Sequence, residues 1–85
     1  MPANRKDTLK VNGVDHNILY NHANNSVTLK SGDGSSVFVL EAVEGQYDLQ
    51  LPNRRDLVVN ELLKLEENGT EITTAVLIPY GFREQ

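Results

Sequence analysis

The chain has 85 residues, a formal net charge of −4, 39% hydrophobic and 24% charged residues, and no cysteine. This length fits one domain spanning 1–85, with residues 1–6 frayed. The lack of cysteine excludes disulfides and thiolate metal sites, and the acidic balance disfavours a general nucleic-acid binder. No stretch resembles a secretory signal or the roughly 20 apolar residues of a membrane span, so we expect a cytoplasmic protein without a membrane partner.

The chain begins with a predicted β-meander. Thr8 to Val11 is a strand candidate, and the Asn12-Gly13 pair after it is the strongest short-range hairpin signal, because both residues tolerate positive φ. A return strand follows, in which apolar and polar residues alternate up to Leu19, which breaks the pattern. A third strand is expected over 26–30, after a turn at 22–25. The inward positions of these two strands are Val14, His16, Ile18, Tyr20, Val27 and Leu29.

Residues 36–43 form the longest run of β-branched and aromatic residues. Apolar side chains fall on both sides of this strand, Phe38 and Leu40 on one and Val37 and Val39 on the other. We therefore expect it to be covered on both faces and to lie inside the sheet. The loop at 31–35 makes it antiparallel to the third strand, and alternation over 46–51 predicts a fifth strand.

The pattern changes to a helical one after Pro52-Asn53. Asn53 suits the N-cap position, the apolar residues of 57–65 follow a helical stripe, and Gly69 suits the left-handed position after the helix. The sequence predicts a helix over 54–67. The competing interpretation is a long hairpin of strands 57–66 and 70–78, but strict alternation fails inside the first of these segments.

Residues 70–78 are rich in β-branched side chains and predict a last strand, which Pro79 ends. Two aromatic residues, Tyr80 and Phe82, follow. They either fold back to close the core or stay exposed as an anchor for another subunit. The overall prediction is a small α+β fold: an antiparallel sheet of five or six strands, one helix near 54–67 on one face, and a C-terminal strand.

His16 and His22 are the two classical candidates for a metal ligand or a general base. His16 falls on the apolar side of its strand and His22 beyond the strand end, so the two side chains need not converge. Further ligands would have to come from neighbouring strands, with Asp15, Asp33 and Asp48 as donors. The favoured interpretation is a histidine at the edge of the core and a histidine in a loop, with no metal and no cofactor.

The segment Ser31-Gly32-Asp33-Gly34-Ser35-Ser36 superficially resembles a phosphate or calcium loop. A strand follows it rather than a helix, and the acidic spacing of an EF-hand is missing, so we interpret it as a hairpin turn. Ser35 or Ser36 could act as a nucleophile only with an oriented histidine base. No Gly-x-Ser-x-Gly elbow exists to provide that orientation.

The region from helix to last strand is acidic, and a solvated surface is the ordinary meaning of such charge. The minority interpretation is a docking patch for a basic partner, including mimicry of nucleic-acid charge. We expect a small interaction module, accessory or inhibitory, that binds another protein without catalysis. The candidate interaction residues are Tyr80, Phe82, Glu61 and Glu67.

The sequence is also compatible with two other functions. One is a small ligand- or metal-binding subunit, or a minor enzyme, that uses His16 and His22 at an oligomer interface. The other, nucleic-acid binding, is disfavoured by the net charge. Because a small sheet leaves its edges unpaired, we also expect a homo-oligomer formed by edge pairing or by packing of helix faces. A monomer mass in light scattering at high protein concentration would refute that expectation.

Overall fold

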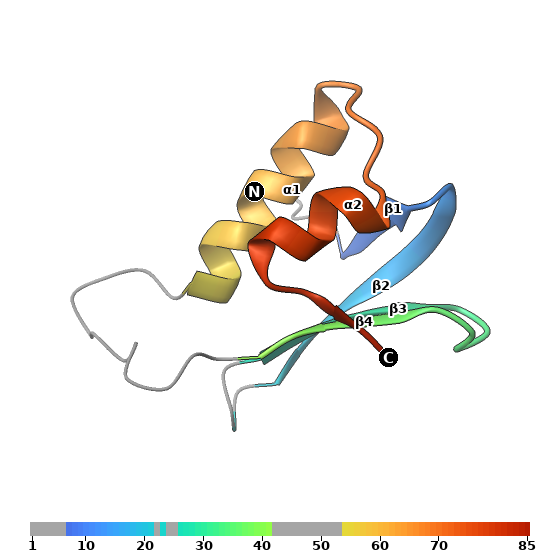
Figure 1. Cartoon of the computed structure of the whole chain (residues 1–85), viewed down its shortest axis with the longest axis vertical. Coiled ribbons are helices and arrows are strands. Elements are labelled where there is room, and N and C mark those ends of the chain that lie inside the picture. The colour runs from blue at the N-terminus through green and yellow to red at the C-terminus, as the bar shows by residue number, and fades with distance from the viewer. Residues whose placement is uncertain (1–6, 22, 24–25, 42–53) are drawn as a thin grey trace, which may run out of the picture.

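The chain folds into a sheet with helices packed on one face (Figure 1). The computed structural model describes residues 7–21, 23, 26–41 and 54–85. The strands are β1 Thr8–Val11, β2 Val14–Asn21, β3 Ser26–Ser31, β4 Val37–Leu40 and β5 Arg83–Glu84, all antiparallel and neighbours in chain order. The helical segments are α1 Arg54–Glu67, α2 Thr74–Leu77 and the 3-10 helix η1 Ile78–Tyr80. The predicted small α+β fold is confirmed.

The turn between β1 and β2 has the predicted form. Asn12 has φ 54° and Gly13 has φ 81°, and positive φ at both central residues is the requirement of a type I′ turn. The side chain of Asn12 also ties this turn to the start of α2. Its Nδ2 donates to Thr74 Oγ1 over 3.0 Å, and its Oδ1 accepts from the Thr74 amide over 3.2 Å.

The core lies between the inner face of the sheet and the helices. Val27 and Leu29 of the central strand β3 are fully buried there, as predicted. In β4 the two faces differ, because Phe38 and Leu40 are buried while Val37 and Val39 are only half-buried. The expectation that β4 is covered on both faces is therefore wrong for the outer one: the helices pack on one side only (Figure 1). The predicted strands at 42–43 and 46–51 and the predicted N-cap at Asn53 lie outside the described residues.

Helix α1 has the predicted bounds, so the competing hairpin is excluded. Its buried stripe faces the sheet and includes Val58, Val59 and Leu62. The helix ends in a Schellman motif, in which the Gly69 amide donates to the Glu66 carbonyl and the Thr70 amide to the Leu65 carbonyl. Gly69 has φ 89° there, which glycine adopts without steric penalty.

The predicted strand at 70–78 is wrong. Only Ile72 makes a bridge, parallel to Val11 of the edge strand β1, and the Asn12 amide donates to its carbonyl over 2.8 Å. The chain then turns into α2 and η1, which bury Leu77. Leu77 is the residue that α2 buries, whereas Ile78 is left half-exposed. Packing of Leu77 into the core overrides the local β propensity of this segment.

The C-terminal strand exists, but it lies after Pro79 rather than before it. Gly81, with φ 105°, ends η1 and lets the chain reverse. Phe82 then enters the core, and β5 pairs with Phe38 and Val39 of β4. β4 thus lies inside the sheet, as predicted, although β5 covers only part of its edge. Among the described residues, no helix has the length and apolar character needed to cross a membrane.

Candidate functional site

The structure buries His16 on the inner face of β2. Its side chain is 1% exposed, and its ring lies 5.8 Å from the Phe38 ring, centroid to centroid, at a tilt of 51°. The sheet register sets His16 opposite Leu9 on one side and opposite Ser31 on the other. The prediction of a histidine on the apolar side of its strand is confirmed. His22 lies outside the described residues.

Both ring nitrogens of His16 have polar partners. Nδ1 lies 2.7 Å from the Val14 carbonyl oxygen. A carbonyl oxygen only accepts hydrogen bonds, so Nδ1 carries the proton and donates. In the neutral ring Nε2 is then an acceptor, and the Ser36 hydroxyl donates to it over 2.8 Å. A metal ion would have to displace one of these partners, and among the described residues no three His, Asp or Glu side chains gather where they could hold one.

Ser36 belongs to a hydrogen-bonded loop centred on Asp33. The carboxylate oxygen Oδ1 of Asp33 accepts from the Ser31 hydroxyl over 2.8 Å, the Ser35 amide over 3.0 Å and the Ser35 hydroxyl over 2.7 Å. The Ser36 amide in turn donates to Ser31 Oγ. These donors, above all the Ser35 amide, lower the pKa of Asp33 to about 2. The segment is a hairpin turn whose polar groups satisfy one another, as the sequence predicts.

The low pKa of Asp33 predicts a pH dependence of stability. A carboxyl whose pKa is lower in the folded chain than its ordinary value of 3.8 stabilises the fold above about pH 4, and this contribution is lost as pH falls toward about 2. Asp33→Asn removes the titrating group but keeps an accepting oxygen. We expect the melting temperature of the variant to fall less between about pH 4 and pH 2 than that of the wild type.

Thermal melts followed by circular dichroism at several pH values measure this. Asp15→Asn is the matched control, because it removes another exposed carboxylate of the same charge outside the loop. If the melting temperatures of Asp33→Asn and the wild type fell equally between about pH 4 and pH 2, the low pKa of Asp33 in the folded chain would be contradicted.

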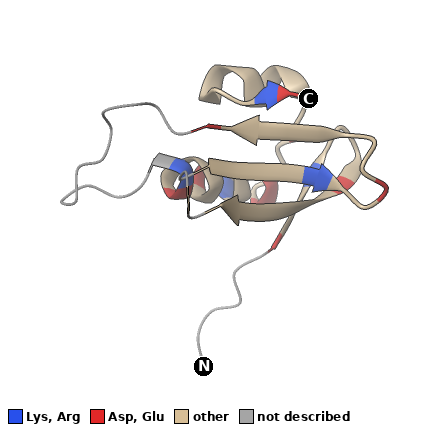
Figure 2. Ribbon diagram, turned by 90° about the horizontal axis from the view of Figure 1, so that it is seen from below, with Lys and Arg blue, Asp and Glu red and all other residues tan. Residues whose placement is uncertain are grey.

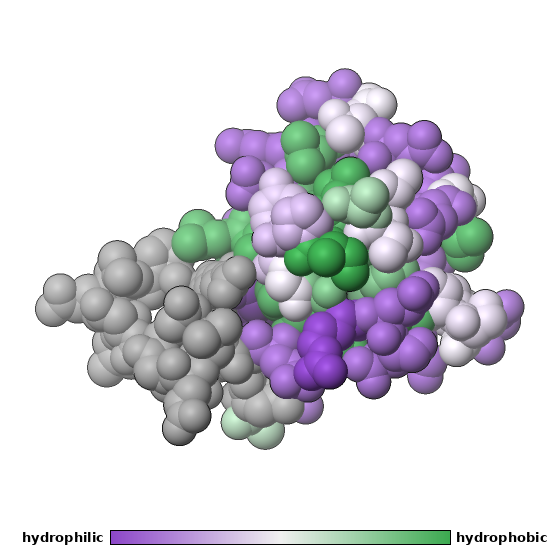
Figure 3. Space-filling model, viewed as in Figure 1, coloured by the Kyte–Doolittle hydropathy of each residue, from purple (hydrophilic) through white to green (hydrophobic). Residues whose placement is uncertain are grey.

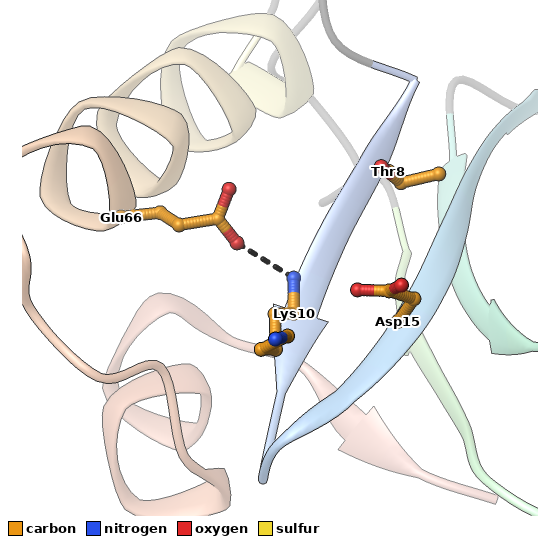
Figure 4. Close-up of a pocket in the computed structure, with 4 residues that line it drawn as sticks. All are labelled: Thr8, Lys10, Asp15 and Glu66. Carbon is orange, nitrogen blue, oxygen red and sulfur yellow. Dashed lines mark hydrogen bonds between the residues drawn. The ribbon is translucent and has the colours of Figure 1, made fainter.

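A charged cleft of about 310 Å³ lies between the first hairpin and the end of α1, lined by Thr8, Lys10, Asp15 and Glu66 (Figure 4). Glu66 reaches across it, and its Oε2 accepts from the Lys10 backbone amide over 2.7 Å. This amide points outward from edge strand β1, so Glu66 protects the edge from pairing with another chain. The cleft is open to solvent and carries both charge signs, which favours a structural contact over a ligand site.

The four candidate interaction residues fall into three environments. The Tyr80 hydroxyl hydrogen-bonds with Glu61, and burial together with this carboxylate raises the pKa of Tyr80. Phe82 is 2% exposed, so it closes the core, the first of its two alternatives. Glu67 is exposed at the end of α1.

Two exposed apolar side chains belong to the same helical segments as Glu61 and Tyr80. Leu57, 52% exposed, precedes Glu61 by one turn on the same face of α1. Ile78, also 52% exposed, precedes Tyr80 by two residues in η1. We give the name helical-face patch to Leu57, Glu61, Ile78 and Tyr80. Figure 3 shows hydrophobic side chains reaching the surface over α1 and α2, bordered by hydrophilic ones.

Charged residues of both signs lie on the helices and on the sheet. The segment 56–71 carries five acidic residues and one basic residue, Lys64. On the sheet side, Figure 2 shows basic positions on β3 and β5, where Lys30 and Arg83 lie opposite the outward Val37 and Val39. The helical-face patch therefore lies along a run of acidic residues that follows the Arg54-Arg55 pair at the start of α1.

No protein-family model, no curated protein and no solved structure matches this chain.

Proposed function

We propose that this chain is a small protein-interaction module that binds a partner protein through the helical-face patch. The observation that supports this is the pair of half-exposed aliphatic side chains, Leu57 and Ile78, on the two helical segments that a half-buried tyrosine and a carboxylate join. An apolar centre with a tyrosine and a polar border is typical of the surfaces at which proteins bind each other.

The charge of the surroundings indicates what kind of partner fits. The acidic residues of 56–71 outnumber the basic ones by five to one, so a partner segment with apolar and basic side chains is complementary. Such charges mainly increase the association rate and suppress wrong partners. The apolar pair provides most of the affinity, because it is desolvated on binding.

A capture experiment with surface variants tests this proposal. The tagged full-length chain is compared with the double variant Leu57→Ser, Ile78→Ser. We expect proteins that the wild type retains specifically to be lost from the double variant, since each removed aliphatic side chain contributes on the order of 1–2 kcal/mol at an interface centre.

The matched control is Leu19→Ser, which removes an aliphatic side chain that is 49% exposed on the outer face of the sheet. Retention by this variant equal to that of the wild type supports the helical-face patch. Loss with Leu19→Ser and retention with the double variant would place the interface on the sheet instead.

A second copy of the chain is the other protein that could occupy the patch. Light scattering at high concentration distinguishes the two cases, because a homo-oligomer formed there dissociates in the double variant but persists with Leu19→Ser. Pairing through the edge of β1 is less favoured, since Glu66 and the Ile72 carbonyl already accept from its outward amides at Lys10 and Asn12.

The metal- or ligand-binding alternative through His16 and His22 receives less support. His16 is buried, and both of its ring nitrogens have partners within the fold. Nucleic-acid binding is likewise disfavoured by the net charge of −4.

A further inference from the structure

We propose that Ser36 is a nucleophile activated by His16, and that it takes an acyl group from an activated ester to form a stable acyl-serine. This inference is independent of the proposed binding function. It depends on the geometry of the Ser36 and His16 side chains in the turn between β3 and β4.

The first requirement for an activated serine is a base within hydrogen-bond reach in the correct tautomer. The Ser36 hydroxyl lies 2.8 Å from Nε2 of His16. The Val14 carbonyl fixes the proton on Nδ1 over 2.7 Å, which leaves Nε2 as the lone-pair nitrogen. Val14 thus orients the base, the role that a carboxylate has in a Ser-His-Asp triad.

The second requirement is that the base be held and the nucleophile be reachable. His16 is 1% exposed and packs against Phe38, so its ring has little freedom to turn away. Ser36 is half-buried at the end of a loop whose other residues, 32–35, are exposed. The acyl donor has to reach the hydroxyl from the side of the exposed residues 32–35, while the imidazole stays in the core.

The other two serines of the turn provide an internal comparison. The hydroxyls of Ser31 and Ser35 both donate to the Asp33 carboxylate. A carboxylate with a pKa of about 2 is a far weaker base than a neutral imidazole, so it does not activate them. Ser35 is more exposed than Ser36, so accessibility alone would favour acylation of Ser35.

The chemistry is limited by the stabilisation available to a tetrahedral intermediate. The amides of Ser31, Gly34, Ser35 and Ser36 are already used within the loop, so they do not form an oxyanion hole in this arrangement. We therefore expect acylation only by esters with a good leaving group, and slow or absent hydrolysis of the product.

p-Nitrophenyl acetate is an activated ester that can serve as the acyl donor. Ser36 Oγ forms a bond to the acetyl carbon as its proton moves to Nε2 of His16. The bond from that carbon to the aryl oxygen breaks, and p-nitrophenolate leaves as an anion. The His16 imidazolium then releases its proton to solvent, and the serine stays acetylated.

The test incubates the folded full-length chain with p-nitrophenyl acetate and locates the added acetyl groups by peptide mass spectrometry. Mapping separates acylated lysines from acylated serines. We expect acetylation of Ser36 in the wild type and in Ser35→Ala, and none at position 36 in Ser36→Ala. In His16→Gln, the rate at Ser36 is expected to fall by about 100-fold or more, the range of general-base catalysis.

Circular dichroism shows whether His16→Gln is folded. If it is folded and Ser36 reacts at the wild-type rate, His16 is not the base and the proposal is overturned. If it does not fold, the rates of acetylation at Ser36 and Ser35 in the wild type still decide whether the proposal holds. Acetylation of lysines alone, or of Ser35 as fast as Ser36, overturns the proposal.

Discussion

Phe82→Ala lowers the free energy of unfolding by about 3–5 kcal/mol, the range for deleting a buried aromatic ring. The Phe82 side chain is 2% exposed and lies between η1 and β5, where it connects the end of the chain to the core. Its removal leaves a cavity that the two-residue strand β5 has little capacity to fill by moving. Urea denaturation followed by circular dichroism measures the change.

Ile78→Ala is the control in the same segment. Its side chain is 52% exposed, and surface substitutions of this kind change stability by about 0.5 kcal/mol or less. If both variants unfolded at the same urea concentration, Phe82 would not belong to the core. At a temperature where Phe82→Ala is still folded, it should bind partners as the wild type does, whereas an anchor role would abolish binding.

Leu62→Ala in the middle of α1 should lower the free energy of unfolding by about 2–5 kcal/mol. Leu62 is fully buried on the stripe of the helix that faces the sheet. Alanine has the highest intrinsic helix propensity, so the substitution does not weaken the helix itself. The measured loss then reports the packing of α1 on the sheet.

Leu57→Ala makes the same chemical change on the same helix at a position that is 52% exposed. We expect it to be close to neutral, with the gain in helix propensity offsetting the little burial that is lost. Equal destabilisation by the two leucine variants would contradict the observed orientation of α1.

The elements predicted correctly are those that short-range patterns specify. The hairpin depends on the positive φ of Asn12 and Gly13, which the chemistry of these two residues favours without help from the rest of the chain. The helix 54–67 depends on a stripe of apolar residues and a glycine after its end. The strand predicted over 70–78 does not form. Its β-branched residues satisfy a strand pattern locally, but Ile72 alone bridges to β1 before the chain turns into α2.

The candidate sites were predicted in part. Alternation placed His16 on the inner side of its strand, whereas the segment with Ser35 and Ser36 was interpreted as a hairpin turn without an oriented base for a serine nucleophile. Their meeting depends on the register of β2 with β3, which sets His16 opposite Ser31, and on how the loop folds back. Neither is encoded in a local pattern, because a slip of one residue would turn His16 to the other face.

By itself, the sequence determined the fold class, the first hairpin, the main helix and the absence of thiol chemistry, since each follows from residue types and their spacing over a few neighbours. The tertiary structure alone decided that Phe82 is buried while Ile78 is exposed, that Glu61 meets Tyr80, and that Ser36 meets His16. These outcomes depend on which surfaces are still exposed once α1 has packed on the sheet. Residues far apart in the sequence set those surfaces, so no local pattern predicts them.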